Sequence, residues 1–317
     1  MSATNKVAVL KGGRSLERNV SLRSGAHAED ALGRLGHDVV GLDVGADLIE
    51  RLRAARPDAA LIALHGPDGE DGTVQSLLEA IGIPYTGSGP AACVCCTDKA
   101  LAKHLMRGVG IPTPDFHSLA EAAIKELGAG EALGSIASSL GFPLVVKPAS
   151  QGSALGVKFA QDSDGLPGAL VGAFSYGQKV VIERYVKGRD LAVSVLDGPG
   201  GPLPLPVVEA VPREEDFYDY ESRYEIGMTT FVCPAELPSE TTARAQELAL
   251  AVYELLGCHG VARVDLMLDE RGELWVLETN VVPGMTATSL LPQAADAAGI
   301  GFDELIARVL QSAFTRS

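Results

Sequence analysis

The chain has 317 residues, 46% of them hydrophobic and 21% charged, and a formal net charge of −15 at pH 7. This composition is typical of a globular protein, and the length allows a sizeable core divided among about two or three domains. The negative charge argues against nucleic acid or an anionic membrane as the main partner, and no apolar run is long enough for a signal peptide or a membrane span, so we expect a cytoplasmic protein with a small ligand.

The N-terminal residues predict a strand, a glycine turn and a helix. Residues 6–10 (KVAVL) are apolar, two glycines follow, and the helix begins near Glu17. The predicted apolar stripe of this helix contains Val20, Leu22 and Ala26. Backbone N–H groups at such a helix start favour an anion, so an acid there indicates a partner for a substrate ammonium. The alternative is that Glu17 only complements the helix dipole.

The next segment alternates strand, helix and strand with short links, which predicts a parallel, doubly wound sheet. These three elements are residues 37–44, 46–55 and 58–66. Ligands of such sheets collect beyond the carboxyl ends of the strands. His65 and Glu70 therefore line a site, unless their glycine-rich loop only turns the chain. A helix over 72–82 and a loop would close this domain near Thr97.

The middle of the chain begins with a predicted helix over 98–109, and residues 118–141 show mixed helical patterns. An apolar strand over 142–147 then ends in Lys147, next to the Ser/Gly loop PASQGSALGVKFA. A lysine that closes a buried strand beside such a loop is a recurrent phosphate grip. The loop matches neither the P-loop nor the dinucleotide-binding fingerprint.

A hairpin-rich stretch follows, which indicates a change to α+β architecture. Glu183 interrupts the strand 180–186, where an unpaired acid would be costly. It needs a donor such as an adenine amino group, unless it faces outward. A turn is expected at 187–190 before a strand over 191–198. The polar segment 212–225 has the length of a functional loop, often a lid. Later helices are expected over residues 239–257 and 302–314.

Residues 262–280 (ARVDLMLDERGELWVLETN) predict two strands joined by a tight turn, with acids in both strands. The strand period places Glu278 and Asn280 on one face, and pairing across the turn places Asp265 opposite them. Three oxygen ligands in this arrangement suit Mg²⁺ with a phosphate-bearing substrate. For an isolated hairpin, solvent-facing acids would be the simpler interpretation.

The five cysteines predict no metal site. Three of them crowd into the segment CVCC, without the second pair or the histidines that a zinc site needs. We interpret them as reduced, buried small residues, with a redox cluster as the alternative. The five are Cys93, Cys95, Cys96, Cys233 and Cys258.

Together these segments resemble the D-alanine–D-alanine ligase family of the ATP-grasp superfamily over nearly the whole chain. The motifs that carry the resemblance, in family order, are GGRSLERNVSL, HGPDGEDGTVQ, DKALAK, VVKPASQGSALGV, FYDYESRY, ARVDLML, LETNVVPGMT and ATSLLP. The resemblance implies a three-domain ATP-grasp fold of α/β and α+β parts, with domains 1–97, 98–188 and 189–317. It implies ATP-dependent synthesis of D-alanyl-D-alanine for peptidoglycan through an acyl phosphate, two Mg²⁺ ions that Mn²⁺ can replace, and a homodimer.

The resemblance also implies roles for individual residues. Magnesium ligands would be Asp265, Glu278 and Asn280. The nucleotide would be held by Lys99, Lys147, Ser150, Gly152, Glu183, Val186 and Asp190. Glu17 would hold the ammonium of the first D-alanine and link to Ser153 and Tyr224, with His65 beside the substrates. Arg263 and the N–H of Gly284 would stabilise the oxyanion. The carboxylate of the second D-alanine would bind Ser289 and the N–H of Leu290.

Three positions depart from the family pattern, one of them the CVCC stretch before Asp98. Arg223 stands where the lid usually has lysine, and Val281-Val282 replaces a small hydroxyl pair. Two alternatives remain: a D-alanine–D-lactate ligase or another ATP-grasp carboxylate–amine ligase, and a non-catalytic nucleotide-binding protein. Tyr224 favours the dipeptide, since depsipeptide-forming relatives tend to carry phenylalanine there. The presence of the metal carboxylates and phosphate lysines disfavours the non-catalytic alternative.

Overall fold

The computed structural model describes residues 4–212 and 229–316. Its N-terminal part is built around a three-stranded parallel sheet of order β2-β1-β3, as the alternating pattern predicts. The elements are β1 (Lys6–Lys11), α1 (Arg18–Arg34), β2 (Asp38–Asp43), α2 (Leu48–Ala55), β3 (Ala59–Ile62), α3 (Thr73–Ala80) and α4 (Pro90–Thr97). Alternate residues of β1 pack into different clusters: Val7 and Val9 join α1, while Ala8 and Leu10 join α2 and α3. The sheet is therefore buried on both faces.

The predicted apolar stripe of α1 is wrong. Ala26 is exposed, and the buried face consists of small residues, including Ser21, Ser24, Gly25 and Ala28. The helix lies so close to the sheet that a Cβ at Gly25 would be 2.6 Å from the Lys11 side chain. Close packing against the sheet selects small side chains, which hydrophobicity alone does not indicate.

The middle part is a separate body around a four-stranded antiparallel sheet of order β4-β7-β5-β6. Its elements are α5 (Lys99–Gly108), β4 (Phe116–Ala120), α6 (Glu121–Leu127), η1 (Ala129–Ala132), α7 (Leu133–Leu140), β5 (Leu144–Pro148), β6 (Lys158–Ala160), α8 (Leu166–Phe174) and β7 (Lys179–Arg184). Helices α7 and α8 cover one face and share a core with β5 and β7. The region of mixed helical pattern thus also contains a strand, β4.

The C-terminal part contains a six-stranded sheet of order β11-β10-β8-β12-β13, with β9 paired to β8. Its elements are β8 (Gly188–Gly198), β9 (Gly201–Pro204), β10 (Val208–Pro212), β11 (Thr229–Val232), α10 (Ser239–Leu255), β12 (Val261–Asp269), β13 (Leu274–Asn280), α11 (Leu290–Ala297), α12 (Phe302–Gln311) and η2 (Ser312–Phe314). The turn expected at 187–190 is wrong from Gly188 onward, because these residues pair with β12 at the start of β8.

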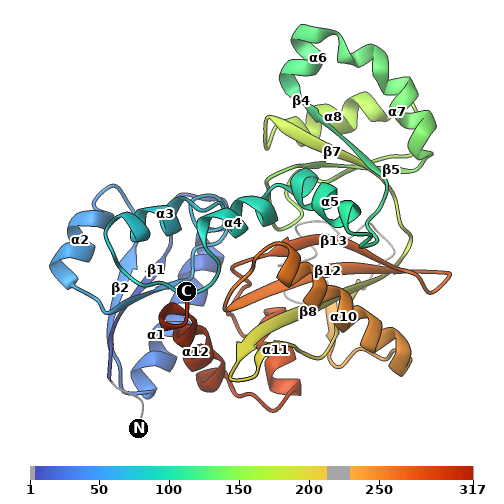
Figure 1. Cartoon of the computed structure of the whole chain (residues 1–317). Coiled ribbons are helices and arrows are strands. Elements are labelled where there is room, and N and C mark those ends of the chain that lie inside the picture. Colours follow the sequence, from blue (N-terminus) through green and yellow to red (C-terminus); the bar gives the residue numbers. More distant parts are fainter. Residues whose placement is uncertain (1–3, 213–228, 317) are drawn as a thin grey trace.

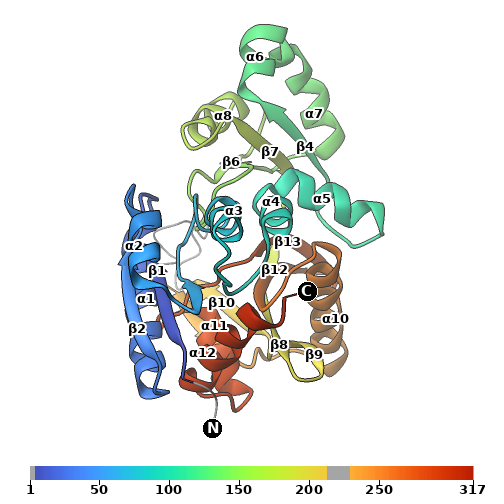
Figure 2. The same ribbon diagram turned by 60° about the vertical axis from the view of Figure 1, so that its left-hand side comes forward.

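The first and last parts of the chain share two hydrophobic clusters, and α5 of the middle part joins one of them through Ala102 and Met106. The small sheet and the helices that cover it have a cluster of their own. Helix α12, near the C-terminus, packs against α1, near the N-terminus. The middle part stands apart from them above the large sheet (Figure 1, Figure 2). We propose the three domains expected from the sequence, with boundaries near residues 97–98 and 188. No helix in the described ranges is long and apolar enough to cross a membrane.

Candidate functional site

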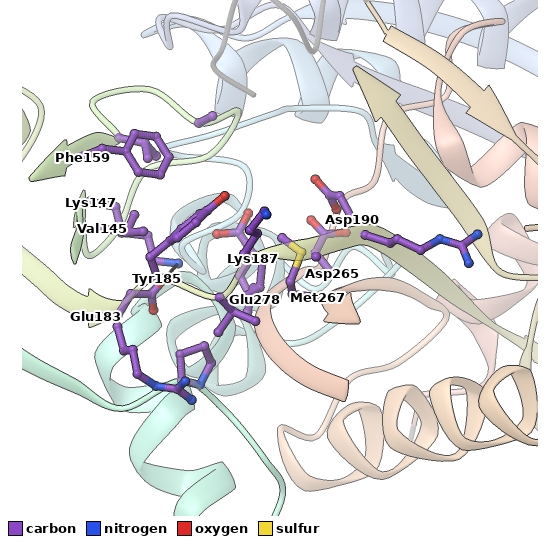
Figure 3. A pocket seen from close by; sticks show the side chains of 18 of the residues that line it. Val145, Lys147, Phe159, Glu183, Tyr185, Lys187, Asp190, Asp265, Met267 and Glu278 are labelled. Carbon is purple, nitrogen blue, oxygen red and sulfur yellow. Dashed lines mark ion pairs between the residues drawn. The ribbon is translucent and has the colours of Figure 1, made fainter. Parts of the chain in front are cut away.

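A cavity of about 650 Å³ lies between the two antiparallel sheets. Its walls come from different bodies: Val145, Lys147 and Phe159 belong to the small sheet, and Asp265 and Met267 to the large one (Figure 3). The volume is within the range of small-ligand and cofactor sites. The segment Glu183 to Asp190 leads from β7 into β8 and also lines the cavity. It contains the three residues expected to contact adenine and ribose, which are Glu183, Val186 and Asp190.

Glu183 is buried inside this wall and is paired with two lysines. Its Oε1 lies 2.6 Å from Lys147 Nζ, and its Oε2 lies 2.8 Å from Lys103 Nζ. The two cations outweigh the effect of burial and lower the pKa of Glu183. The outward-facing alternative is therefore wrong, since the side chain is 3% exposed. Lys103 and Lys147 therefore supply part of the hydrogen-bond donors that this buried acid needs.

The loop after β5 approaches the site from the small sheet. Lys99 donates from Nζ to the backbone oxygen of Gln151, and Ser150 is exposed. Ser153 has a φ of 54° and donates from its hydroxyl to the carboxylate of Glu17. This contact joins the middle body to the N-terminal one. It was expected only from family resemblance, and the structure confirms the contact.

A second pocket of about 80 Å³ adjoins the large cavity, and both are lined by Asp190, Ala210 and Asp265. Most residues expected to act on the amino-acid substrates line it together: Glu17, His65, Arg263, Gly284, Ser289 and Leu290. Asn280, an expected metal ligand, lines it as well. They come from the N-terminal and the C-terminal parts of the chain. The two pockets therefore form one continuous region, in which a large ligand and a small one would meet at the shared acids.

Glu17 precedes α1 without capping it, since its side chain makes no cap hydrogen bond. Burial first, and then the charge of Glu70, raise its pKa, while the Ser153 hydroxyl opposes this shift. A Cβ at Gly66 or at Gly152 would lie 2.8 Å or 3.2 Å from its Oε2. Both glycines therefore permit the backbone to approach the carboxylate closely. A buried acid facing a small pocket favours the ammonium-binding interpretation over the helix-dipole one.

His65 follows β3 and is fixed by hydrogen bonds to both ring nitrogens. Nδ1 lies 2.9 Å from the backbone oxygen of Val282, and Nε2 lies 2.9 Å from the hydroxyl of Ser24. The Ser24 oxygen also accepts from the N–H of Met285. A carbonyl only accepts, so Nδ1 carries a proton, and in the neutral imidazole Nε2 accepts from Ser24. The histidine therefore orients the chain after β13 instead of presenting an unpaired nitrogen.

The predicted hairpin forms, and its register brings the expected metal ligands together. Asp265 pairs with Glu278 across the strands, and Arg263 pairs with Asn280. Asp265 is 2% exposed, so the solvent-facing interpretation is wrong for this acid, whereas Glu278 is partly exposed. Lys99 Nζ lies 3.3 Å from Glu278 Oε2. The side-chain oxygen of Asn280 accepts from the N–H of Val282.

These side chains are suited to a hard cation. Two carboxylates and one amide oxygen are ligands that Mg²⁺ prefers when substrate phosphates complete its shell. Among the described residues, no group of three or more His, Cys, Asp or Glu side chains is arranged to hold a metal ion. By its oxygen chemistry, the set of Asp265, Glu278 and Asn280 fits a magnesium ion whose remaining ligands are phosphate oxygens and water.

The segment after β13 supplies groups for a carboxylate. Ser289 is the residue before α11 and Leu290 is the first helical residue, so the N–H of Leu290 has no acceptor within the helix. The Ser289 hydroxyl lies 2.8 Å from the hydroxyl of Thr286 and accepts from its N–H. A Cβ at Gly284 would lie 2.6 Å from the Ser289 oxygen. A helix N-terminus and two hydroxyls thus converge on the small pocket.

Other sequence-based expectations have mixed outcomes. Arg223 and Tyr224 lie outside the described residues. Val281 and Val282 are buried in the core, and Val282 contacts the site through its backbone.

All five cysteines are free, and Cys93 and Cys96 are buried in helix α4, which the sequence analysis did not predict. Burial raises the pKa of Cys93 to about 12, which fits inert core thiols.

One buried residue behind the wall of the large cavity is not among those expected from the sequence. Lys103 is fully buried and reaches Glu183 from α5, where it lies one turn after Lys99. The i, i+4 spacing of the two lysines in DKALAK was the available signal, because it places both on one face of the helix.

Comparisons with known proteins show the family of this chain. Models of the D-ala D-ala ligase N-terminus and C-terminus match residues 47–88 and 105–311. A D-alanine–D-alanine ligase of Syntrophotalea carbinolica is 44% identical over 98% of this chain and 97% of its own length. One from Pelotomaculum thermopropionicum is 41% identical, again over 98% of this chain and 97% of its own length.

Solved structures have the same fold. The D-alanine–D-alanine ligase of Bacillus anthracis complexed with ATP is 37% identical, with a TM-score of 0.82 over 98% of each chain. The VanG D-Ala:D-Ser ligase of Enterococcus faecalis has a TM-score of 0.82 at 24% identity, over 98% of this chain and 100% of that one. At this identity the second comparison speaks for the fold alone.

Proposed function

The chain belongs to the D-alanine–D-alanine ligase family, and we propose that it uses ATP to join two molecules of D-alanine into D-alanyl-D-alanine for peptidoglycan. The observation that carries this proposal is the junction of the two pockets at Asp190 and Asp265. A cavity large enough for a nucleotide and a small polar pocket share these acids, so a transferable phosphoryl group and a carboxylate would meet there.

The first step forms an acyl phosphate. The carboxylate of the first D-alanine attacks the γ-phosphorus of ATP, and ADP leaves. In this step Glu17 holds the ammonium of that D-alanine, which fixes its carboxylate toward the large cavity. Lys99 and Lys147 neutralise phosphate oxygens, and the loop with Ser150 and Gly152 covers them.

The second step forms the amide bond. The amine of the second D-alanine loses a proton and attacks the acyl carbon, the C–O bond to phosphate breaks, and phosphate leaves. Ser289 and the N–H of Leu290 bind the carboxylate of this second molecule. Arg263 and the N–H of Gly284 stabilise the tetrahedral oxyanion, where one well-placed donor typically contributes about 3 kcal/mol.

We further propose that Asp265, Glu278 and Asn280 hold two Mg²⁺ ions, which Mn²⁺ can replace. Bound with ATP, the ions would neutralise charge that builds up on the β- and γ-phosphate oxygens. In this proposal Glu183 and Val186 contact the adenine, and Asp190 the ribose. A cytoplasmic homodimer is the expected form, which sedimentation of the purified protein would test.

The direct test is ADP release by the purified protein with ATP and Mg²⁺. D-Alanine should support release of ADP and formation of D-alanyl-D-alanine, whereas L-alanine should not. Supplying D-alanine together with D-lactate or D-serine, followed by product analysis, measures the choice of acceptor. Absence of dipeptide with D-alanine, or a product mainly of depsipeptide, would contradict the proposal.

A further inference from the structure

Lys103 forms a buried link between three elements that surround the nucleotide cavity. Its Nζ lies 2.8 Å from Glu183 Oε2 on β7 and donates over 2.7 Å to the hydroxyl of Thr113. Thr113 in turn donates to the backbone oxygen of Val276 on β13. The lysine side chain is 0% exposed. It does not line the cavity in the described part of the chain, so any effect on a ligand must pass through a neighbour.

The neighbour through which it can act is Glu183, which Lys103 shares with Lys147. Each lysine holds one carboxylate oxygen, at 2.8 Å and 2.6 Å. Lys147 lines the cavity, where the proposed function assigns it to phosphate. When Lys147 turns to phosphate, Glu183 remains a buried carboxylate, and removing all of its cationic partners would be strongly unfavourable.

We propose that Lys103 is a positioning residue of the ATP site: it keeps Glu183 charged and in place when Lys147 leaves it for the phosphates. This inference rests on the proposed function, because it takes the large cavity to be the ATP site. It explains why two buried lysines surround one acid. One cation moves to the ligand, and the other remains with the carboxylate that faces the adenine.

Substitution of Lys103 tests this role. Lys103→Met removes the charge and keeps the length, so ATP should bind at least tenfold more weakly by calorimetry. In turnover, the KM for ATP should rise by a similar factor while the KM for D-alanine changes less than twofold. Lys103→Arg keeps a cation and should recover most of the ATP affinity. Lys125→Met, which removes an exposed lysine of α6, is the control and should leave ATP binding unchanged.

A double variant separates positioning from a general structural role. In Glu183→Gln the carboxylate charge is absent, so adding Lys103→Met should change ATP affinity by less than twofold. This comparison also decides the matter if Lys103→Met alone does not fold. A further tenfold loss in the double variant, or wild-type ATP affinity in Lys103→Met, would overturn the inference. Failure of the wild type to bind ATP would overturn the proposed function together with it.

Discussion

Arg263 and Asp265 form a two-bond fork on the same face of β12. Arg263 Nε donates to Asp265 Oδ1 over 2.7 Å, and Nη2 donates to Oδ2 over 2.9 Å. Residues two apart on a strand share a face, so this ion pair follows from the strand period. It places a proposed oxyanion donor against a proposed metal ligand. In the proposed mechanism, this ion pair would couple phosphoryl transfer and amide formation within three residues of one strand.

Arg263→Lys should reduce kcat much more than ATP affinity. Lysine keeps the charge but cannot make the planar fork, so the oxyanion loses a fixed donor. The expected loss is about a hundredfold in kcat, corresponding to about 3 kcal/mol, with an ATP Kd within about threefold of wild type. Steady-state kinetics and calorimetry measure the two quantities. Equal losses in both would place Arg263 in nucleotide binding.

Glu278→Gln should abolish ADP release without unfolding the protein. The amide is nearly isosteric but uncharged, so metal binding and phosphoryl transfer should suffer by about a thousandfold or more. Binding of Mn²⁺ with ATP, followed by electron paramagnetic resonance, gives a readout independent of turnover. Glu270→Gln in the exposed turn of the same hairpin is the control. Normal turnover of Glu278→Gln at saturating Mg²⁺ would exclude the assignment.

The raised pKa of Glu17 has consequences for stability. A carboxyl whose pKa is higher in the folded than in the unfolded state destabilises the fold when it is ionised. This cost is complete at pH values above the folded-state pKa and disappears at pH values below the unfolded-state pKa. Glu17→Gln should therefore melt higher than wild type at pH 8, by on the order of 2 °C. The difference should vanish near pH 4. Thermal unfolding across this pH range measures it, and D-alanine turnover should be lost at every pH.

Glu70 raises the pKa of Glu17 through its charge, so Glu70→Gln should lower that pKa. If ionised Glu17 binds the ammonium, kcat/KM for D-alanine falls on acidification through this pKa. The acid limb of the profile should then lie at lower pH in Glu70→Gln. Glu50→Gln on the exposed side of α2 serves as the matched control. An unmoved limb would mean that another group controls it.

ATP affinity should weaken as the pH rises through the pKa of Lys103. Burial lowers this pKa to about 8, with Lys147 and Arg107 contributing in the same direction and Glu183 opposing. When Lys147 moves to phosphate, one positive neighbour leaves and the pKa of Lys103 rises, so binding takes up a proton. Calorimetry from pH 7 to 9.5 should show this limb in wild type. Lys103→Arg should lack it, because arginine stays charged.

Gly284→Ala should weaken binding of the second D-alanine. The added Cβ would meet the Ser289 hydroxyl at 2.6 Å and displace it from the small pocket. We expect the higher of the two KM values for D-alanine to rise about tenfold, with ATP binding unchanged. Gly33→Ala in α1, where a Cβ meets nothing within 4 Å, controls for the loss of a glycine. A normal KM would show that Ser289 can move without consequence.

The sequence determined much of this protein because its signals are local. Alternation of apolar strands and helices predicted the N-terminal parallel sheet, and strand period with a turn predicted that Asp265 would lie opposite the region of Glu278 and Asn280. Motif order indicated the family, which the comparisons show. These inferences need only neighbouring residues, since strand period and turn chemistry act over a few positions.

The tertiary structure decided which charged groups share a buried space. Glu183 sits in an apolar strand, and only folding shows that lysines from α5 and β5 are its partners, because their positions in the chain are far apart. The buried face of α1 was mispredicted since close packing against the sheet, and not hydrophobicity, selects small residues there. The pairing of Ser153 with Glu17 likewise joins residues 136 positions apart. Contacts of this kind depend on how separate bodies pack, and no local pattern encodes that packing.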